Sequence, residues 1–359
     1  MKKKILVEIS HHGFGHASQT SLVLNEMLLR SNEPIDLVIV SAVPEWFLRE
    51  RIQGSFEYIY EMTDPGLIMQ NILDVDYAKS WSAYKIQHKL WPDLLAKKRM
   101  FLTDRKFDLV IANVSYVCIE AASQLGIPSV AFSSLHWADI VTTYFSEEVG
   151  VAAIVAQILQ AYNLSSLFIE IVPNTSLKGL DNAQKLGPIG RVGKNVRQQI
   201  IEKFPSFSGR KIGVVSLGGG EFPMLSADWQ SSDLSLFVPD FAMFAGNSYL
   251  QSIAKSGFEF LDLLASCDFV VTKPGYGLFT ETVFAQRPCF YVRRQGWPEE
   301  AGLLRWLKNF VPYHEISQQQ VCDGDFRLSE LTEPVREPGE SQLLPMQGQV
   351  ASTILALMS

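Results

Sequence analysis

The sequence ILVEISHHGFGH, residues 5–16, places a short apolar run directly before a loop of histidines and glycines. Ile5–Ile9 has the length and composition of a buried strand. Ser18–Arg30 continues as a helix, with apolar residues spaced at i, i+4. A strand, a glycine-containing loop and a helix in this order begin a parallel β-α unit, and ligands of such folds bind at the carboxyl ends of the strands. The loop therefore predicts a ligand site.

The same alternation continues outward from this loop. Further strands are expected at 36–41, 56–60, 108–114, 129–134 and 167–172, and helices at 45–51, 77–103, 116–125 and 151–162. Apolar strands separated by helix-period segments favour a parallel sheet with helices on both faces.

A second series of the same kind follows a segment rich in Asn, Gly and Pro, residues 173–194, which is typical of a linker. Its strands are expected near 211–216, 234–238, 268–272 and 289–293, its helices near 258–266, 278–285 and 299–307, and a last apolar helix near 348–358. We therefore predict an α/β protein with two Rossmann-like parallel-sheet domains facing a cleft: residues 1–185, residues 186–342, and a C-terminal helix in 343–359.

The composition of the chain argues against several classes of function. A chain of 359 residues holds about two domains, and its net charge of −7 argues against a nucleic-acid partner. The four cysteines form no Cys-x-x-Cys pair, so we expect no metal site and a cytoplasmic location. The uncharged stretch 149–168 contains six Gly, Gln, Asn and Ser residues, and predicts a buried helix and strand instead of a membrane span. Peripheral membrane contact and the oligomeric state stay open.

The histidine loop is the first candidate site. Three of the six histidines of the chain fall within residues 11–16. Gly13 and Gly15 allow a ligand to approach the backbone, and His16, at the start of the helix, can act as a base near neutral pH. The third glycine of a dinucleotide-binding motif is absent. A tight turn with surface histidines is the alternative interpretation.

A second candidate site opens the helix after the strand 268–272. Lys273, Gly275, Tyr276 and Gly277 lie where backbone N–H groups at a helix N-terminus suit a diphosphate. Lys273 adds a point charge, and Glu281 can accept hydrogen bonds from ribose hydroxyls. The alternative is a turn that serves packing only.

Two further segments could also contact a ligand. Two cations and two carboxylates after the strand 289–293 predict a cradle for phosphate and sugar hydroxyls: Arg293, Arg294, Glu299 and Glu300. Gly218 and Gly219 follow the strand 211–216 and could admit a phosphate or the acceptor. A solvated loop and a plain chain turn are the respective alternatives.

Together these motifs resemble nucleotide-sugar glycosyltransferases of the GT-B fold. The group includes the peptidoglycan N-acetylglucosaminyltransferase and plant galactolipid synthases, and the sequence looks more like the glycosyltransferase-like N-terminal region of plant L-arabinokinases than like either of these. The resemblance is carried by the segments HGFGHA at 12–17, ASCD at 265–268 and KPGYG at 273–277 with Glu281, and by the Arg and Glu residues at 293, 294, 299 and 300.

The resemblance implies an enzyme that moves a sugar from a nucleoside diphosphate sugar, such as a UDP-sugar, to a hydroxyl acceptor, with no cofactor and no obligatory metal. The C-terminal domain would bind the donor, the N-terminal domain would bind the acceptor, and the C-terminal helix would pack back on the N-terminal domain. His16 would be the general base. Related enzymes orient this histidine with an aspartate; the matching residue here is Asn113, and His136 with Asp139 could substitute. A binding module without turnover and a nucleotide-sugar epimerase are the alternatives.

Overall fold

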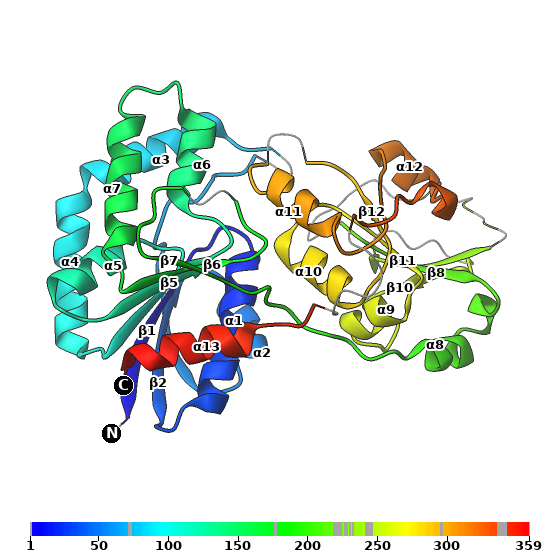
Figure 1. Ribbon diagram of the computed structural model, residues 1–359, viewed down its shortest axis with the longest axis horizontal. Coiled ribbons are helices and arrows are strands. Elements are labelled where there is room, and N and C mark those ends of the chain that lie inside the picture. The colour runs from blue at the N-terminus through cyan, green and yellow to red at the C-terminus, as the bar shows by residue number, and fades with distance from the viewer. Residues whose placement is uncertain are drawn as a thin grey trace. The chain divides into compact units, whose positions relative to one another are not determined.

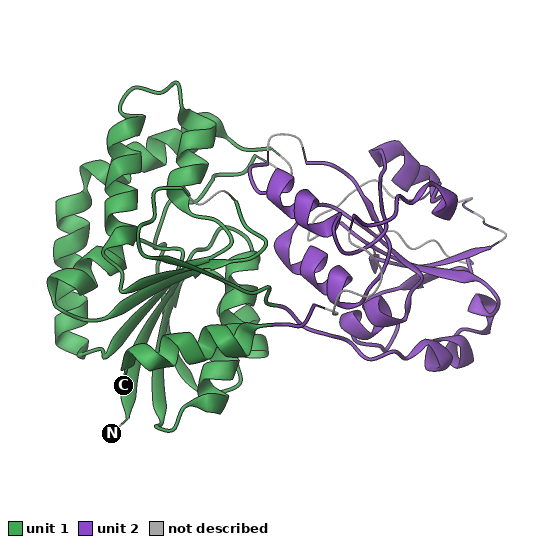
Figure 2. Ribbon diagram, viewed as in Figure 1, with its two compact units in different colours: residues 1–189, 346–359 green, residues 190–345 purple. Residues whose placement is uncertain are grey.

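Two parallel sheets, each surrounded by helices, organise the chain (Figure 1). The computed structural model describes residues 2–70, 74–175, 178–217, 225, 229, 231, 233–240, 247–294, 297–335 and 343–358. Unit 1 comprises Met1–Ile189 with Met346–Ser359, and unit 2 comprises Gly190–Pro345 (Figure 2). The chain thus returns to unit 1 through its last helix.

The sheet of unit 1 has seven strands in the order β3-β2-β1-β4-β5-β6-β7, and every neighbouring pair is parallel. The strands are β1 (Lys3–Ile9), β2 (Ile35–Ser41), β3 (Phe56–Tyr60), β4 (Leu109–Asn113), β5 (Ser129–Ser133), β6 (Leu167–Ile171) and β7 (Ala183–Leu186). The central strands β4 and β5 are buried throughout because helices cover both faces, which explains their unbroken apolar runs.

Helices cover the two faces of this sheet (Figure 1). One face carries α1 (Gly15–Arg30), α2 (Glu45–Arg51) and α13 (Gln347–Leu355), and α13 lies beside α1. The other carries α3 (Tyr77–Lys89), α4 (Trp91–Arg105), α5 (Val117–Gln124) and α7 (Val151–Asn163), and α6 (Trp137–Phe145) packs against α7. The single helix expected over 77–103 is two helices, because Pro92 lacks an N–H and is accommodated in the first turn of α4.

Unit 2 has a six-stranded parallel sheet in the order β10-β9-β8-β11-β12-β13. Its strands are β8 (Lys211–Ser216), β9 (Leu234–Val238), β10 (Leu250–Ser252), β11 (Phe269–Thr272), β12 (Cys289–Tyr291) and β13 (Tyr313–Glu315). Its helices are α8 (Arg197–Lys203), α9 (Phe260–Ser266), α10 (Tyr276–Phe284), α11 (Glu300–Leu307) and α12 (Gln318–Asp323). Short 3-10 turns occupy Pro205–Phe207 and Leu328–Glu330 here, and Ala356–Met358 in unit 1.

Alternate residues of β11 serve two apolar cores in unit 2. Phe269 and Val271 belong to one buried cluster and Val270 to another, as the two-residue period of a strand requires. Gly213 on the neighbouring β8 is required by packing, since a Cβ there would overlap the ring of Phe269. The strand at the centre of this sheet is therefore sandwiched between two apolar layers.

The uncharged stretch 149–168 contains all of α7 and the start of β6, which confirms the expected helix and strand. Within the described ranges, no helix is both long and apolar enough to cross a membrane.

A buried ion pair fastens α4 to β1. Glu8 and Lys98 are 1% and 7% exposed, and the Lys98 ammonium lies 2.5 Å from the Glu8 carboxylate and 3.7 Å from that of Glu61. Burial by itself would lower the pKa of Lys98, but the charges of Glu8 and Glu61 outweigh burial and raise it. Lys98 therefore keeps its charge in the fold, and removing it would leave the buried Glu8 without its partner.

Lys98→Met should lower the free energy of unfolding by about 3–5 kcal/mol, because it leaves the Glu8 carboxylate buried without its cation. The double variant Glu8→Leu/Lys98→Met should recover most of that loss, since it removes both buried charges. Urea unfolding measures both. Lys97→Met is the matched control: Lys97 lies on the same helix but pairs with Glu61 at the surface, at 3.1 Å, and should cost less than about 1 kcal/mol. Equal losses for Lys97→Met and Lys98→Met would contradict this account.

Candidate functional site

The sheet of unit 1 joins His16 to Asn113. Ile9 pairs with Asn113 in the β1–β4 register, and the Ser10 N–H donates to the Asn113 carbonyl at 2.8 Å. His16, the second residue of α1, then places its Nδ1 2.7 Å from the Asn113 side-chain oxygen. The Asn113 Nδ2 lies 3.4 Å from two acceptors, the His16 carbonyl and the Gln19 side-chain oxygen, so its Oδ1 faces His16. His16 Nδ1 is therefore the protonated nitrogen, and Nε2 keeps its lone pair.

Burial sets the charge of His16. The side chain is 6% exposed, and burial, assisted by nearby His11, lowers its pKa to about 4, although the hydrogen bond that His16 donates to Asn113 acts in the opposite direction. The imidazole is therefore neutral at pH 7, which is the state in which a base can accept a proton.

The loop between β1 and α1 is open. Gly13 has φ +71°, a backbone conformation that favours glycine, and a Cβ at Gly13 or Gly15 would meet no described atom within 4 Å. Phe14, the N-cap residue of α1, provides no side-chain cap. A ligand could therefore approach the first backbone N–H groups of this helix.

His136, the substitute candidate for the base, caps α6 instead. Its Nδ1 accepts a hydrogen bond from the Asp139 N–H at 3.0 Å, and its Nε2 donates to the Lys178 carbonyl at 3.2 Å. Burial lowers its pKa against the nearby Asp139. The Asp139 carboxylate accepts a hydrogen bond from the Thr175 hydroxyl at 3.1 Å. Because both ring nitrogens of His136 are engaged, the geometry favours His16 as the base.

Sequence reasoning did not single out Asp64, which lies beneath the histidine loop. Asp64 is 2% exposed and accepts a hydrogen bond from Ser10 at 2.9 Å. It belongs to the segment TDPG at 63–66, which follows the third strand of the sheet. This segment is a polar turn after a parallel strand, so the rule that ligands bind at carboxyl ends could have drawn attention to it.

In unit 2, α10 begins without a side-chain cap. Its N-cap residue is Gly275, and a Cβ on the exposed Gly277 would meet no described atom within 4 Å. Burial, with the nearby Arg294, lowers the pKa of Lys273 to about 8, and its ammonium makes no ion pair with a described residue. Backbone N–H groups and a lysine short of counter-charge form a potential anion site.

The other charged residues predicted to bind the donor, at 293, 294, 299 and 300, make contacts within their own loop. Both oxygens of Glu300 are occupied at 2.6 Å, one by the Arg293 side chain and one by the Arg294 N–H. Glu299 accepts a hydrogen bond from Trp297, on whose ring the Arg294 guanidinium stacks at 3.9 Å.

Glu300 therefore holds the arginine loop in place through both of its oxygens. Glu281 lies 3.4 Å from Arg191. Gly218 and Gly219 lie outside the described residues, so the structure gives no view of them.

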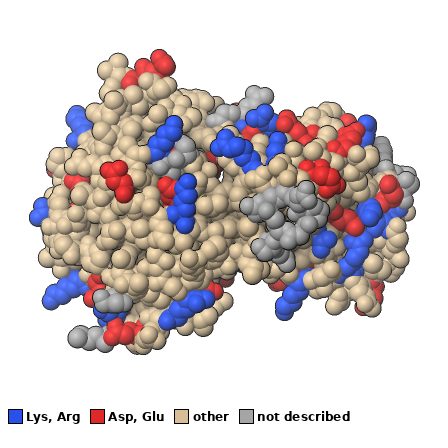
Figure 3. Space-filling model, in the orientation of Figure 1, with Lys and Arg blue, Asp and Glu red and all other residues tan. Residues whose placement is uncertain are grey.

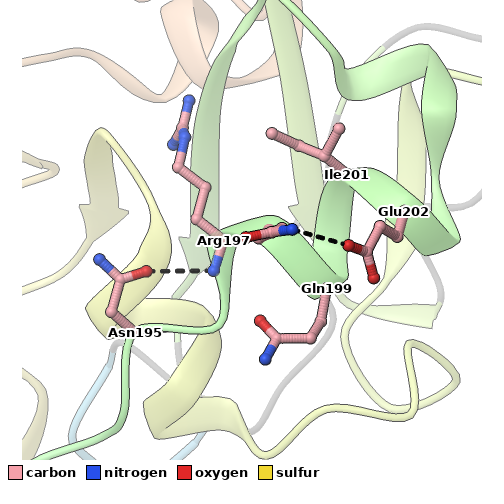
Figure 4. Close-up of a pocket in the computed structure, with 6 residues that line it drawn as sticks. Asn195, Arg197, Gln199, Ile201 and Glu202 are labelled. Carbon is pink, nitrogen blue, oxygen red and sulfur yellow. Dashed lines mark hydrogen bonds between the residues drawn. The ribbon is translucent and has the colours of Figure 1, made fainter.

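A surface hollow beside α8 contains none of these residues (Figure 4). Two hydrogen bonds join residues of its lining, from the Arg197 N–H to Asn195 and from Gln198 to Glu202, each at 3.0 Å. The lining consists of Asn195, Arg197, Gln198, Gln199, Ile201 and Glu202. Acidic and basic side chains are scattered over the visible face of the molecule (Figure 3). Among the described residues, no group of three or more His, Cys, Asp and Glu could hold a metal ion.

The lowered pKa of His16 predicts a pH-dependent stability. The pKa falls from 6.5 to about 4 on folding, so the unfolded chain binds more protons between these values. The free energy of unfolding is therefore unaffected by His16 above pH 6.5. It decreases as the pH falls from 6.5 toward 4, by about 3 kcal/mol in total. Urea unfolding from pH 7.5 to 4.5 should show this loss in the wild type and a smaller one in His16→Gln. Identical pH dependence in the two proteins would contradict the assignment.

Comparisons with known proteins support the fold. No family model matches the sequence. L-arabinokinase from Arabidopsis thaliana is 21% identical over 324 residues, which cover 87% of this chain and 30% of the plant protein. The chain thus matches less than a third of that relative's length.

Two solved structures cover nearly the whole chain. The calicheamicin glycosyltransferase CalG4 superimposes with a TM-score of 0.60 at 16% identity, over 99% of this chain and 94% of CalG4. UGT89C1 of Arabidopsis thaliana, complexed with UDP, gives a TM-score of 0.54 at 15% identity, over 100% and 95% of the two chains. At these identities the likeness concerns the fold. The chain therefore has the GT-B fold that its motifs predict, with one Rossmann-like parallel sheet in each unit.

Proposed function

We propose that this protein transfers a sugar from a nucleoside diphosphate sugar to a hydroxyl group of a small-molecule acceptor. The observation that carries the proposal is the His16–Asn113 pair. A neutral imidazole, whose Nδ1 lies 2.7 Å from the Asn113 side-chain oxygen and donates to it, keeps its Nε2 lone pair at the carboxyl edge of a parallel sheet. In a chain with the GT-B fold, that edge is where a base is needed.

The proposed reaction uses His16 as general base. Its Nε2 takes the proton of the acceptor hydroxyl while the hydroxyl oxygen forms a bond to the anomeric carbon. The bond between that carbon and the phosphate oxygen breaks, and the nucleoside diphosphate leaves with the electron pair. Asn113 accepts a hydrogen bond from the resulting imidazolium, but its amide stabilises that charge less than a carboxylate would.

The donor diphosphate is proposed to bind at the N-terminus of α10. Backbone N–H groups near Gly275 and Gly277, with Lys273 and Arg294, would meet the charge that develops on the leaving group without a metal. UDP is our proposed nucleotide, because the structurally similar UGT89C1 is complexed with UDP. The four cysteines are free thiols, which supports a reducing compartment such as the cytoplasm.

The low pKa of His16 favours one competing function. A histidine with a pKa of about 4 is a weak base, which suits a nucleotide-sugar-binding module without turnover. The two functions differ in one outcome. The module would bind UDP-sugars but release no UDP with any hydroxyl acceptor.

Lys273→Ala should weaken UDP binding by about 10- to 100-fold, the scale of one charge-assisted hydrogen bond. Glu281→Ala should weaken it by a similar factor if Glu281 binds the ribose. Isothermal titration calorimetry measures both. Lys255→Ala is the control, because this exposed lysine follows β10, three strands from β11 in the unit 2 sheet, and pairs with Asp240 at 3.2 Å. Unchanged UDP affinity in folded Lys273→Ala would remove α10 from the donor site.

His16→Ala should reduce turnover by roughly 10²–10⁴-fold, the usual contribution of a general base. UDP affinity should stay unchanged, because the proposed donor site lies in unit 2. A thermal-shift screen over UDP-sugars followed by a UDP-release assay with hydroxyl acceptors provides the measurement. His12→Ala should lose less, since its Nδ1 bonds to the backbone at Leu67. Full turnover in His16→Ala would place the base elsewhere.

Asn113→Asp should preserve or increase turnover. A carboxylate beside His16 raises the pKa of the imidazole by about 1–3 units and strengthens the base. An NMR titration of His16 measures the pKa in both proteins. A higher pKa with abolished turnover would contradict the proposed role of the pair.

A further inference from the structure

The side-chain amide of Asn113 has an oxygen end and an NH2 end, and the end that faces His16 decides which ring nitrogen carries the proton. The oxygen, 2.7 Å from Nδ1, accepts a hydrogen bond from Nδ1–H and leaves the lone pair on Nε2. An NH2 group in its place would donate to Nδ1 and leave the proton on Nε2. Only the first arrangement provides a base at Nε2, so the groups at the far end of the amide bear on the chemistry of His16.

Two acceptors lie at the amide nitrogen of Asn113. The His16 carbonyl and the Gln19 side-chain oxygen are each 3.4 Å from Nδ2. The carbonyl also accepts a hydrogen bond from the Thr20 hydroxyl at 2.8 Å, so it is shared between donors. Gln19 thus provides a second acceptor, from a side chain, that the amide nitrogen faces.

Ser134 holds the Gln19 side chain in this orientation. The Gln19 Nε2 donates to the Ser134 hydroxyl oxygen at 3.2 Å, which directs the other end of the Gln19 amide to Asn113. Ser134 directly follows β5, and its carbonyl accepts a hydrogen bond from the Thr175 N–H at 3.0 Å. His16 and Gln19 are three residues apart on α1 and therefore share a face of the helix. The network thus connects α1 with the ends of β4 and β5.

All four side chains of this network, His16, Asn113, Gln19 and Ser134, are buried. Polar groups in a buried site depend on one another for hydrogen bonds, and a donor or acceptor left unmatched there is unfavourable. Reversing the Asn113 amide would bring its oxygen next to the His16 carbonyl and the Gln19 oxygen, and oxygens that only accept cannot bond to one another. The network therefore selects the direction of the Asn113 amide.

We propose that Gln19 is a positioning residue: held by Ser134, it directs the Asn113 oxygen to His16 and so keeps the proton of the neutral imidazole on Nδ1. Gln19 acts through Asn113 and does not touch the substrate. The consequence for turnover rests on the proposed function, in which Nε2 is the base. The position of the proton does not, and it is measured without substrate.

Nitrogen NMR on the full chain, labelled with 15N-histidine, locates the proton at pH 7.5, where the His16 imidazole is neutral because its pKa is about 4. Protonated and unprotonated ring nitrogens differ widely in chemical shift, so the spectrum gives the ratio of the Nδ1–H to the Nε2–H tautomer. The signals that disappear in His16→Gln identify His16 among the six histidines.

The wild type should carry the proton on Nδ1. Gln19→Met keeps the length of the side chain and removes the acceptor, so it should lower the tautomer ratio about tenfold, the scale of one hydrogen bond. Ser134→Ala should lower the ratio about threefold, because Gln19 stays but is no longer held, and it remains informative if Gln19→Met does not fold. Gln19→Glu should preserve the ratio, since a carboxyl group retains an oxygen that faces the Asn113 NH2.

Ser21→Ala is the matched control. Ser21 is a buried polar residue of the same helix, and its hydroxyl donates to the Ala17 carbonyl at 2.7 Å, outside the network. Its variant should keep the wild-type ratio. The proposal would be overturned by an unchanged ratio in folded Gln19→Met or, where that variant does not fold, in Ser134→Ala. An equal change in Ser21→Ala, a loss in Gln19→Glu equal to that in Gln19→Met, or a wild-type proton on Nε2 would also overturn it.

UDP release by the same variants reports separately on the proposed reaction. Turnover should fall in proportion to the fraction of molecules whose His16 carries the proton on Nδ1, because the other tautomer has no lone pair on Nε2. Turnover that does not follow this fraction would contradict His16 as the base, whereas the NMR ratio alone decides on the role of Gln19.

Discussion

The parallel pairing of β1 with β4 is the constraint on which the unit 1 site depends. It sets Ile9 opposite Asn113 and therefore brings the first turn of α1 to the end of β4. A slip of one residue would turn Asn113 to the other face of the sheet and separate it from His16. Because β4 is buried throughout, such a slip would also change which side chain fills each position of the close-packed core. The packing of the core thus protects the geometry of the site.

The same burial that fixes His16 also weakens it as a base. Burial keeps the imidazole neutral, and Asn113 fixes which nitrogen carries the proton without adding a negative charge. In unit 2 the environment of Lys273 likewise disfavours its charged form, since burial and the nearby Arg294 lower its pKa. An anion bound there would relieve the repulsion between the two cations. Both groups are thus held in states that a ligand or a reacting hydroxyl would stabilise.

The alternation of strands and helices made the fold predictable, whereas many contacts of the site were not. The proximity of His16 and Asn113 follows from the rule that parallel strands end at one edge. Asp64 could not be linked to Ser10, 54 residues away, because local patterns carry no information on which loop turns inward. Glu300 follows cations in the sequence, but only its side-chain direction shows that it holds the arginine loop. The short edge strands β7 and β13 are partly exposed and lack an apolar run.

A crystal structure of the protein with UDP tests the central claim most directly. The account predicts the diphosphate within hydrogen-bond distance of the backbone N–H groups that open α10 and of the Lys273 ammonium. UDP bound elsewhere, for example in the hollow beside α8, would contradict it.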